Sequence, residues 1–413
     1  MKTLKLMLCF FRKNPFLLLF VLLELTLSMA LFAEQLGELQ YQRYALDLYR
    51  DSGLVSCDHF TAHTVPGLTD SPESAKGAIF EAVENTDGVE AIGISRTFGG
   101  INAADLNLEK KLQRRYSVSL LTPSVFGSLP LELSDGTWQP EEEPSQTVVN
   151  VVACGSLASE YRVGDVVSIA VEDESGGTAV LELKVVGRVA SPGFSIALNI
   201  SSNAFSADDL FSASDCFIAV PTQRNEALLS RYASVNRAER GMMVRYEQDL
   251  DEAALERARA SLRSWGYLTT PEEIITNTEM RIREDFNERF PMLMFFLIIS
   301  SFSMISSVIV TQMKMYRNNA VYYLCGSTAP RCFLYSGIPA AFVGFLALLA
   351  NLGWIAYNHM NLDLWSSSRP KLLNGTTVAI VTVYFAVTIL VAILASYYVF
   401  QKNTPIESYR KNK

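Results

Sequence analysis

The spacing of four hydrophobic runs constrains this 413-residue chain more than any other feature. One run lies near the start, at 15–33, and three crowd the last third, at 291–310, 333–357 and 378–400. Each is about 19 to 25 residues long, which is the length that an α-helix needs to cross about 30 Å of hydrocarbon. The sequence therefore predicts one transmembrane helix before a long polar block and three after it.

The predicted segments follow from these runs. They are a cytoplasmic N-terminus with the first transmembrane helix at 1–33, an extracytoplasmic domain with stalk helices at 34–289, the second transmembrane helix at 290–312, a cytoplasmic coupling loop at 313–332, the third transmembrane helix at 333–357, a short extracytoplasmic loop at 358–377, the fourth transmembrane helix at 378–400 and a cytoplasmic tail at 401–413.

Charge separates the polar block from the rest of the chain. Residues 34–289 hold 22 basic and 40 acidic residues, a net charge of −18, whereas the remainder holds 13 basic and 3 acidic residues, a net charge of +10. Nucleic-acid binding requires a basic face for the phosphates. We therefore expect no nucleic acid among the partners of the polar block, and we expect membrane lipids around the apolar runs.

Basic residues also predict the orientation. Four precede the first run, three lie between the second and third runs, and four follow the last run, while the loop between the third and fourth runs holds only Arg369 and Lys371. Short loops rich in Lys and Arg stay in the cytoplasm. This bias places both termini in the cytoplasm and the polar block outside it, in a multi-pass membrane protein. The expected location is a bacterial cytoplasmic membrane, with which the small number of cysteines in the polar block agrees.

The first run has a competing interpretation as a cleaved signal peptide. Its basic flank and the residues Ser28–Ala30 resemble such a peptide, but signal peptides have apolar cores of about 7 to 15 residues, which is shorter than this run. We therefore expect a membrane span here. Three cysteines, Cys57, Cys154 and Cys216, fall in the polar block, which allows one disulfide at most and leaves its existence open.

Helical stalks are predicted on both sides of the polar block. No proline interrupts 16–50, so one helix is expected from Pro15 to about Arg50, roughly 50 Å long at 1.5 Å per residue. A second helix is expected to begin at Pro271, after two threonines and before Glu272 and Glu273, and to continue into the second span. Pro291 is expected to kink it.

Between the stalks the pattern alternates between strand and helix periods. The predicted strands are Val89–Ser95, Tyr116–Thr122, Val148–Ala153, Val166–Val171, Val180–Val189, Cys216–Val220 and Met242–Tyr246, and the predicted helices are near 72–83, at Gly155–Tyr161 and at Glu252–Trp265. The predicted fold class is thus a membrane protein with four transmembrane α-helices and a mixed α+β extracytoplasmic domain on helical stalks.

No catalytic or nucleotide-binding motif is present. The sequence has no GxxxxGK[ST], GxSxG, HExxH or CxxC pattern, so we expect a non-catalytic membrane subunit with no cofactor. A weak metal candidate is Cys57-Asp58-His59 with His63, because two His at i, i+4 would share one face of a helix. Pro66 and Gly67 argue against that helix, and the expectation is no metal, with these residues in a loop from the stalk to the domain.

Small and polar residues in the spans predict contacts between helices. Glu24 is the one acidic residue inside a run, and a carboxylate there costs on the order of 3 kcal/mol unless it finds a partner. A proton or substrate site is the alternative, but no run contains a cation. Small residues allow helices to approach closely. The predicted helix-interface residues are Glu24, Ser300, Ser303, Ser307, Ala340 and Gly344.

The basic segment 311–332 is the expected contact with a cytoplasmic partner. Tyr316–Leu324 is predicted to form a short helix that Gly326 ends, and Ser327 or Thr328 would cap the next helix. The alternative is a simple polar turn that joins two spans. The predicted coupling residues are Arg317, Asn318, Asn319, Tyr322, Leu324, Gly326, Ser327 and Arg331.

Together these segments resemble the permease subunits of FtsX/MacB-type ABC transporters, which have one span, a large outer domain and then three spans. The segments that carry the resemblance are Arg317–Leu324, Cys325–Ser327 and Ala329–Phe333 in the coupling loop, Gly155–Ala158 with Tyr161–Val167 and Leu183–Val189 in the outer domain, and Pro405–Arg410 in the tail. Asn318 and Asn319 stand where the family usually has an acidic and a second basic residue, so docking here would use different contacts.

The resemblance implies a permease subunit that forms a homodimer or heterodimer and binds a separate ABC ATP-binding subunit. ATP-driven motion would pass across the membrane to the outer domain, for export or extraction of a peptide, lipoprotein or hydrophobic drug. Two alternatives remain open at this point. One is a regulatory complex that controls a cell-wall hydrolase or senses antimicrobial peptides, and the other is a membrane-anchored receptor without an ATPase.

Overall fold

The computed structural model describes most of the chain, in two compact units. The described residues are 15–62, 79–109, 112–129, 131–140, 148–172, 177–190, 194–196, 198, 205–212, 215–229, 241–326, 328–360 and 371–402, with the backbone alone at 15–18, 195, 311–312, 314–320, 322–324, 329–330, 332–340, 358–360, 395–396 and 399–402. The helical unit comprises residues 1–40 and 284–413, and the α/β unit comprises residues 41–283.

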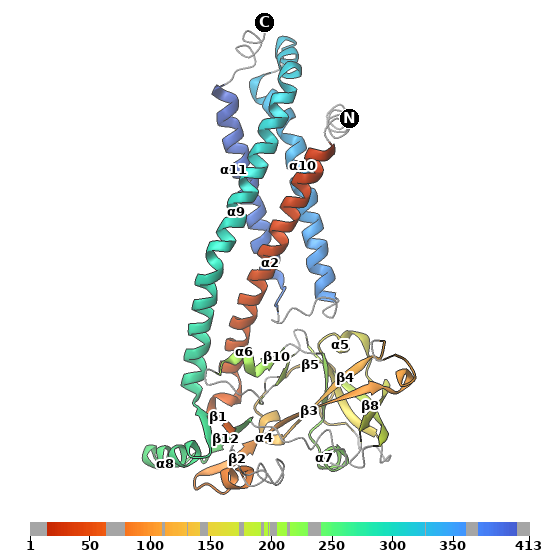
Figure 1. Cartoon of the computed structure of the whole chain (residues 1–413), viewed down its shortest axis with the longest axis vertical. Helices are drawn as coiled ribbons and strands as arrows, with labels where there is room; N and C mark the ends of the chain where they lie inside the picture. Colours follow the sequence, from red (N-terminus) through yellow and green to blue (C-terminus); the bar gives the residue numbers. More distant parts are fainter. Residues whose placement is uncertain are drawn as a thin grey trace. The chain divides into compact units, whose positions relative to one another are not determined.

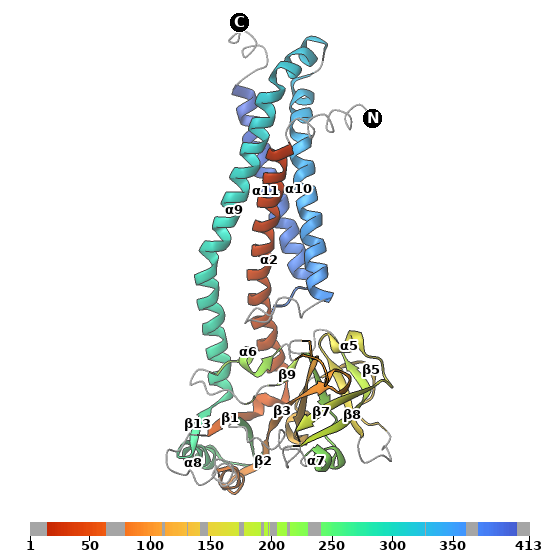
Figure 2. The ribbon, with the colours of Figure 1, turned by 45° about the vertical axis from the view of Figure 1, so that its right-hand side comes forward.

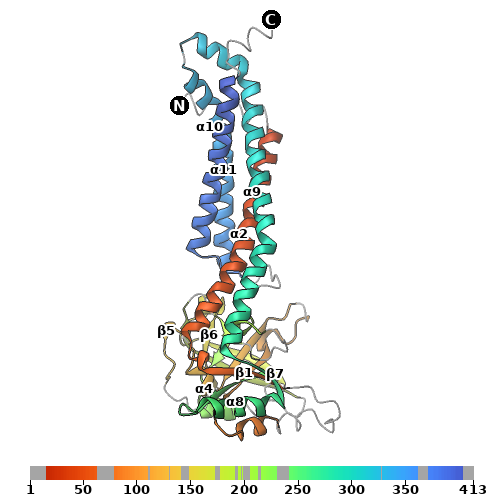
Figure 3. The ribbon, with the colours of Figure 1, turned by 90° about the vertical axis from the view of Figure 1, so that its left-hand side faces the viewer.

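Four long helices build the helical unit, and they lie side by side in all three views (Figures 1, 2 and 3). They are α2 (Pro15–Asp51), α9 (Pro271–Leu324), α10 (Ala329–Met360) and α11 (Gly375–Lys402). Three of the described helical stretches are long and apolar enough to cross a membrane, namely Leu19–Asp51, Pro271–Val310 and Gly375–Leu394. The third predicted transmembrane helix, 333–357, lies in α10, whose described apolar stretch Ala341–Tyr357 is shorter than the other three.

Two apolar clusters hold the four helices together. One cluster buries side chains from every helix: Val21, Leu25, Met304, Val343, Ala347 and Ala392. A second cluster contains Ala33, Leu348, Ile355 and Val381. Without a hydrophobic driving force between helices in lipid, van der Waals packing of this kind and polar contacts must hold them together.

Helices α2 and α9 are each continuous from the helical unit into the α/β unit. The helix predicted from Pro15 to about Arg50 extends to Asp51. The helix predicted to begin at Pro271 begins there, and a capping box fixes its start: the Thr270 N–H donates to Glu273 at 2.8 Å, and the Glu273 N–H donates to the Thr270 hydroxyl at 3.3 Å.

The structure differs from the sequence prediction in the segment after the second span. Most of the predicted coupling loop at 313–332 is helical, because α9 continues to Leu324 and α10 begins at Ala329. No glycine or proline lies between Pro291 and Gly326, so nothing interrupts the helical hydrogen bonds. Gly326, at φ 90°, then turns the chain.

The larger sheet of the α/β unit closes on itself. The order of its seven strands is β5-β8-β6-β11-β4-β3-β7, and β7 also pairs with β8, so six strands form a ring and β5 flanks β8. The strands are β3 (Ser95–Asn102), β4 (Arg115–Leu121), β5 (Leu133–Gly136), β6 (Val148–Cys154), β7 (Val166–Glu172), β8 (Thr178–Val189) and β11 (Cys216–Ala219).

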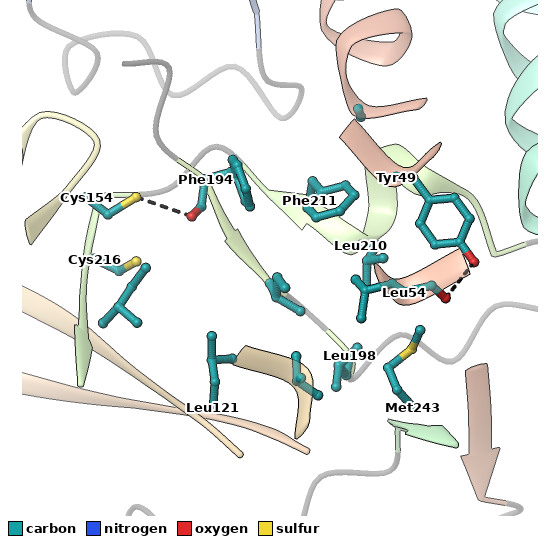
Figure 4. Close-up of a cluster of buried hydrophobic side chains, with 14 of the residues drawn as sticks. Tyr49, Leu54, Leu121, Cys154, Phe194, Leu198, Leu210, Phe211, Cys216 and Met243 are labelled. Atoms are coloured by element: carbon teal, nitrogen blue, oxygen red, sulfur yellow. Dashed lines mark hydrogen bonds between the residues drawn. The ribbon is translucent and has the colours of Figure 1, made fainter. Parts of the chain in front are cut away.

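Alternating side chains from this ring enter two different cores. In β6, Val149, Val151 and Ala153 point into a core shared by all six ring strands, whereas Val152 and Cys154 point to the opposite face. That opposite face joins a second core, to which α2 contributes Tyr49 (Figure 4). Helix α9 contributes Ile274 to the same core. The ends of α2 and α9 are thus built into the α/β unit.

A second sheet has four strands in the order β13-β1-β12-β2. They are β1 (Cys57–Ala62), β2 (Val89–Gly93), β12 (Gly241–Tyr246) and β13 (Gly266–Thr269). This sheet buries Phe60, Met242 and Val244 against the helical residues 79–84 and helix α8 (Glu252–Arg263). Asp251 caps α8 by accepting from the Ala254 N–H at 2.6 Å.

The remaining described elements are short. They are the 3₁₀ turns η1 (Gly53–Ser56) and η2 (Ala103–Asp105), the helices α4 (Pro123–Phe126), α5 (Leu157–Glu160), α6 (Ala207–Leu210) and α7 (Gln223–Leu229), and the paired strands β9 (Ser195–Ile196) and β10 (Phe211–Ser212). All seven predicted strands are present within a few residues. The prediction missed β1, where it expected a loop, and also β3, β5, β9, β10 and β13.

Candidate functional site: polar contacts of the long helices

The predicted coupling residues lie at the end of α9 and the start of α10. Arg317, Asn318, Asn319, Tyr322 and Leu324 belong to the last turns of α9, where the backbone is described. Gly326 forms the turn, Ser327 lies outside the described residues, and Arg331 is exposed in the first turn of α10. The end of the long helix α9, followed by a glycine turn, therefore replaces the separate short helix that the sequence suggested.

Glu24 meets Ser303 inside the helical unit. The Ser303 hydroxyl of α9 donates to the Glu24 carboxylate of α2 at 2.5 Å. Both side chains are partly buried. A hydrogen bond to an ionised oxygen is roughly twice as strong as a neutral one, and it lowers the cost of a carboxylate in an apolar span. Two of the predicted interface residues are thus brought together.

Two further polar contacts cross the helical unit. The buried Tyr384 hydroxyl of α11 donates to the Ser300 hydroxyl of α9 at 2.8 Å. The fully buried Asn351 of α10 donates from Nδ2 to the Thr26 carbonyl of α2 at 3.2 Å. Sequence reasoning missed Tyr384 and Asn351. A lone amide and a tyrosine well inside apolar runs were the signals available, because each needs a hydrogen-bond partner there.

Gly344 lies at a close approach of α10 to its neighbours. A Cβ atom at Gly344 would stand 3.1 Å from Phe385 and 3.3 Å from Ile389, both of α11. Ser307 of α9 is buried. The side chain of Ala340, the last predicted interface residue, lies outside the described part of the structure.

Arg289 forms the centre of a charged cluster between α2 and α9. Its guanidinium lies 2.5 Å from the Glu38 carboxylate and 3.7 Å from the Asp285 carboxylate, and it donates to the Gln35 side-chain oxygen at 2.9 Å. Arg289 and Glu38 are only 11% and 14% exposed. The pair therefore joins the two helices where solvent screens it weakly.

The segment 371–377, which leads into α11, is attached to α2. Lys371 pairs with Glu34 at 3.1 Å, the Leu372 N–H donates to the Gly37 carbonyl at 2.9 Å, and the Thr377 hydroxyl donates to the Gln40 side-chain oxygen at 2.8 Å. Glu34, which binds Lys371, and Glu38, which binds Arg289, are four residues apart and so are neighbours on the surface of α2. Helix α2 is thus tied to both α9 and α11 within the helical unit.

Other contacts tie α2 and α9 into the α/β unit. The Tyr41 hydroxyl donates to the Phe211 carbonyl, and Arg50 of α2 pairs with Glu279 of α9 at 2.5 Å. Helix α6 rests on α9 as well: the Thr278 hydroxyl accepts from the Ala207 N–H at 2.9 Å.

Arg281 of α9 completes this attachment to α6. Its guanidinium donates to the Ser206 hydroxyl at 2.7 Å and to the Asp209 carboxylate at 2.9 Å. Burial raises the pKa of the neighbouring Asp208 carboxyl, against the lowering effect of Arg281. The first turns of α9 are therefore fixed to α6 by both hydrogen bonds and charge.

The weak metal candidate does not have the helical geometry that its spacing suggested. Cys57, Asp58 and His59 lie in strand β1, and His63 lies outside the described residues. Within the described part of the chain, no three His, Cys, Asp or Glu side chains gather. Asp58 instead accepts from Arg259 at 2.8 and 3.0 Å and from the Tyr246 hydroxyl at 2.9 Å.

His59 is likewise used in packing. Its ring stacks on Phe205 with centroids 3.8 Å apart, and its Nε2 lies 3.1 Å from the Leu198 carbonyl, so Nε2 carries the proton. Burial lowers the pKa of His59 to about 4, although the bond to Leu198 opposes this shift. A neutral, hydrogen-bonded histidine in a core explains its burial without a ligand.

Among known proteins, only solved structures show similarity to this chain. No family model matches the sequence. No curated protein matches it either. The periplasmic region of MacB from Actinobacillus actinomycetemcomitans is similar over 57% of this chain and 98% of that chain, with 13% identity and a TM-score of 0.33.

Two further solved structures are similar. The extracellular domain of the noncanonic ABC-type transporter YknZ from Gram-positive bacteria matches 52% of this chain and 97% of that chain, with 9% identity and a TM-score of 0.28. A domain of a putative permease protein from Porphyromonas gingivalis matches 53% of this chain and 93% of that chain, with 12% identity and a TM-score of 0.27.

Proposed function

We propose that this chain is the permease subunit of an ABC transporter of the FtsX/MacB type, with four spans, both termini in the cytoplasm and the α/β unit outside. A separate ATP-binding subunit hydrolyses ATP, and this chain transmits the resulting motion across the membrane. The given sequence contains no nucleotide-binding loop, which leaves another chain or a gradient as the energy source, and the proposal takes the first.

One observation carries the proposal: α2 and α9 are unbroken helices that each contain an apolar span and continue into the core of the α/β unit. A continuous helix transmits displacement along its length, because its backbone groups are hydrogen-bonded within the helix; in α9 this series lacks one bond at Pro291, which has no N–H. Ion pairs join the two helices at Arg289–Glu38 in the helical unit and at Arg50–Glu279 in the α/β unit. Such a pair of helices suits the transfer of motion.

The polar contacts within the spans also support transmission of motion over passage of a polar substrate. Glu24 is bonded to Ser303, and Ser300 is bonded to Tyr384, so these groups are used between helices. A pathway for a hydrophilic substrate would need polar groups that face a water-filled cavity. The substrate class that fits is therefore a peptide, a lipoprotein or a hydrophobic drug handled at the outer surface of the membrane.

The ATP-binding subunit is proposed to dock at the turn between α9 and α10, with Arg317 to Leu324, Gly326, Ser327 and Arg331 at the contact. Arg331 is exposed at the start of α10. Gly326 forms the turn between the end of α9 and the start of α10. A force on this turn would act on the end of α9 itself. The complex is proposed to contain two permease chains and two ATP-binding subunits.

Copurification tests this function. Tagged full-length chain, purified from the cell that naturally makes it, should retain an ATP-binding subunit and show vanadate-sensitive ATPase activity. Arg331→Glu should reduce the retained subunit about tenfold, because reversal of a charge at a docking contact weakens binding. The matched control is Arg162→Glu, the same charge change at an exposed turn of the α/β unit. Retention of no ATP-binding subunit by the unaltered chain would contradict the proposal.

A further inference from the structure

The two cysteines Cys154 and Cys216 face each other in the closed sheet of the α/β unit. Cys154 is the last residue of β6, Cys216 is the first residue of β11, and the antiparallel register places them directly opposite. Opposite residues of antiparallel strands point to the same face of a sheet. Figure 4 shows both sulfur atoms on that shared face, in the core that also contains Phe194.

The backbone geometry of this pair suits a disulfide. The Val220 N–H donates to the Asn150 carbonyl, which makes these two residues a hydrogen-bonded pair of the antiparallel ladder. Hydrogen-bonded pairs recur at every second residue, and Cys216 and Cys154 lie four residues along each strand. They are therefore a hydrogen-bonded pair too, with Cα atoms about 5.5 Å apart. Disulfides span Cα distances of about 4.4 to 6.8 Å, most often about 5.5 to 6 Å. The Cβ atoms of a hydrogen-bonded pair lie about 5.5 Å apart, so they must approach by about 1.5–2 Å to reach the mean disulfide spacing of about 3.8 Å. Cys154 ends β6 and Cys216 begins β11, so this shift would involve strand ends and not strand centres.

The surroundings keep the two sulfur atoms together. Both side chains are essentially fully buried, and the Cys154 thiol donates to the Phe194 carbonyl at 3.3 Å. A hydrogen bond with Cys216, and then burial, raise the pKa of the Cys154 thiol well above its ordinary value. Both residues are free, buried cysteines in this structure, and the raised pKa keeps the Cys154 thiol protonated once the unit is folded, so the pair would react while the unit folds.

Cys57 does not compete for this pairing. It begins strand β1 in the other sheet, and its sulfur lies 3.9 Å from the Ser56 hydroxyl. Its cross-strand neighbour is Arg245. The fold thus selects one of the three pairings that three cysteines allow.

We propose that Cys154 and Cys216 form a structural disulfide that ties β6 to β11 in the α/β unit. The oxidant is an external disulfide, either a small-molecule disulfide or a disulfide-exchange protein outside the cytoplasm. The Cys154 thiolate attacks one sulfur of that disulfide and displaces the other as a thiolate. The Cys216 thiolate then attacks the Cys154 sulfur and displaces the second. The two cysteines lose two protons and two electrons, and the oxidant becomes two thiols.

Peptide mapping of the full-length protein from membranes tests the disulfide. Alkylation in denaturant without reductant, followed by trypsin, should leave the peptides 116–162 and 189–224 covalently joined, about 2 Da lighter than their sum. Peptide 51–76, with Cys57, should be alkylated. Reductant should separate the joined peptides, and Cys57→Ser should leave the linkage intact. Full alkylation of all three cysteines, or a linkage to Cys57, would overturn the inference.

Two controls separate this inference from the proposed orientation of the chain. Reduced protein, refolded with oxidised glutathione, should form the same linkage wherever the α/β unit lies in the cell, whereas failure to form it would show that the geometry is unsuitable. Cysteine-accessibility labelling of the exposed position 162 then reports the side of the membrane. An α/β unit labelled from outside with Cys154 and Cys216 both free would contradict the disulfide and leave the transporter function standing.

Discussion

The Arg289 guanidinium of α9 lies 2.5 Å from the Glu38 carboxylate of α2, and both side chains are more than four-fifths buried. Breaking a buried ion pair by removing one partner leaves an uncompensated charge. Arg289 also holds Asp285 and Gln35, so it joins several groups of the two helices. This pair is the contact on which the proposed transmission of motion most depends.

Replacement of Arg289 should therefore destabilise the chain and weaken coupling. For Arg289→Ala we expect a loss of about 3 kcal/mol in the free energy of unfolding, measured by thermal unfolding of the detergent-purified protein. The matched control is Arg283→Ala, an exposed arginine of the same helix, for which a change below about 1 kcal/mol is expected. Equal effects of the two substitutions would show that the Arg289–Glu38 pair contributes no more to the free energy of unfolding than an exposed arginine does.

Gly344 should tolerate no large side chain. Its missing Cβ would already stand 3.1 Å from Phe385 and 3.3 Å from Ile389. Gly344→Leu should therefore separate α10 from α11, with a cost of about 1–3 kcal/mol and a lower melting temperature. Gly353 of the same helix is the control, because a Cβ there meets nothing within 4 Å, and Gly353→Leu should leave the melting temperature unchanged.

Stability should fall on acidification because of His59. Its pKa is lowered from 6.5 to about 4 by burial, so the folded state favours the neutral ring. Below pH 6.5 the unfolded chain takes up a proton that the folded chain does not bind until about pH 4. The stabilising contribution is thus complete above pH 6.5 and is lost between pH 6.5 and 4, to a total of about 3 kcal/mol.

The substitution His59→Gln isolates this effect. Glutamine has no proton to gain in this range, and its amide can still donate toward the Leu198 carbonyl. The fall in melting temperature from pH 7 to pH 4.5 should be smaller in the variant than in the unaltered chain. An identical fall in both proteins would assign the pH dependence to the carboxylates instead.

Asp58 should be essential to the smaller sheet. Its carboxylate is 2% exposed, receives two bonds from Arg259 and one from Tyr246, and compensates the charge of that arginine. Asp58→Asn should cost about 3 kcal/mol, measured by chemical denaturation. Asp135→Asn breaks the ion pair with Arg188, where the aspartate is 53% exposed, and should cost less than about 1 kcal/mol.

Local signals gave much of the architecture in advance. The apolar runs predicted the long helices, and the absence of breakers predicted that α2 would extend from Pro15 to about Arg50. Thr270, Pro271 and Glu273 predicted the start of α9, because caps act within one turn. Period-two alternation predicted seven strands. These features depend on neighbours in the chain, which a sequence displays directly.

The partners of the polar residues were harder to predict from the sequence. Glu24 and Ser303 were each recognised as interface residues, but Arg289 and Glu38 are separated by about 250 positions, and nothing in either local sequence names the other. Strand β1 was mistaken for a loop with a weak metal pattern, because Asp58 and His59 are polar residues in a buried strand. Arg259, Tyr246 and Phe205, all distant in sequence, make their burial possible.

The sequence alone determined the alternation of apolar spans and an acidic middle block, the uninterrupted helices that lead from one to the other, and the absence of any nucleotide-binding motif. Only the tertiary structure decided that six strands close into a ring, that Cys154 lies opposite Cys216, and that α2 is tied to both α9 and the segment before α11. Helical periods and caps act between residues a few positions apart. Strand order and ion-pair partners depend instead on which distant surfaces fit and neutralise each other when the chain packs.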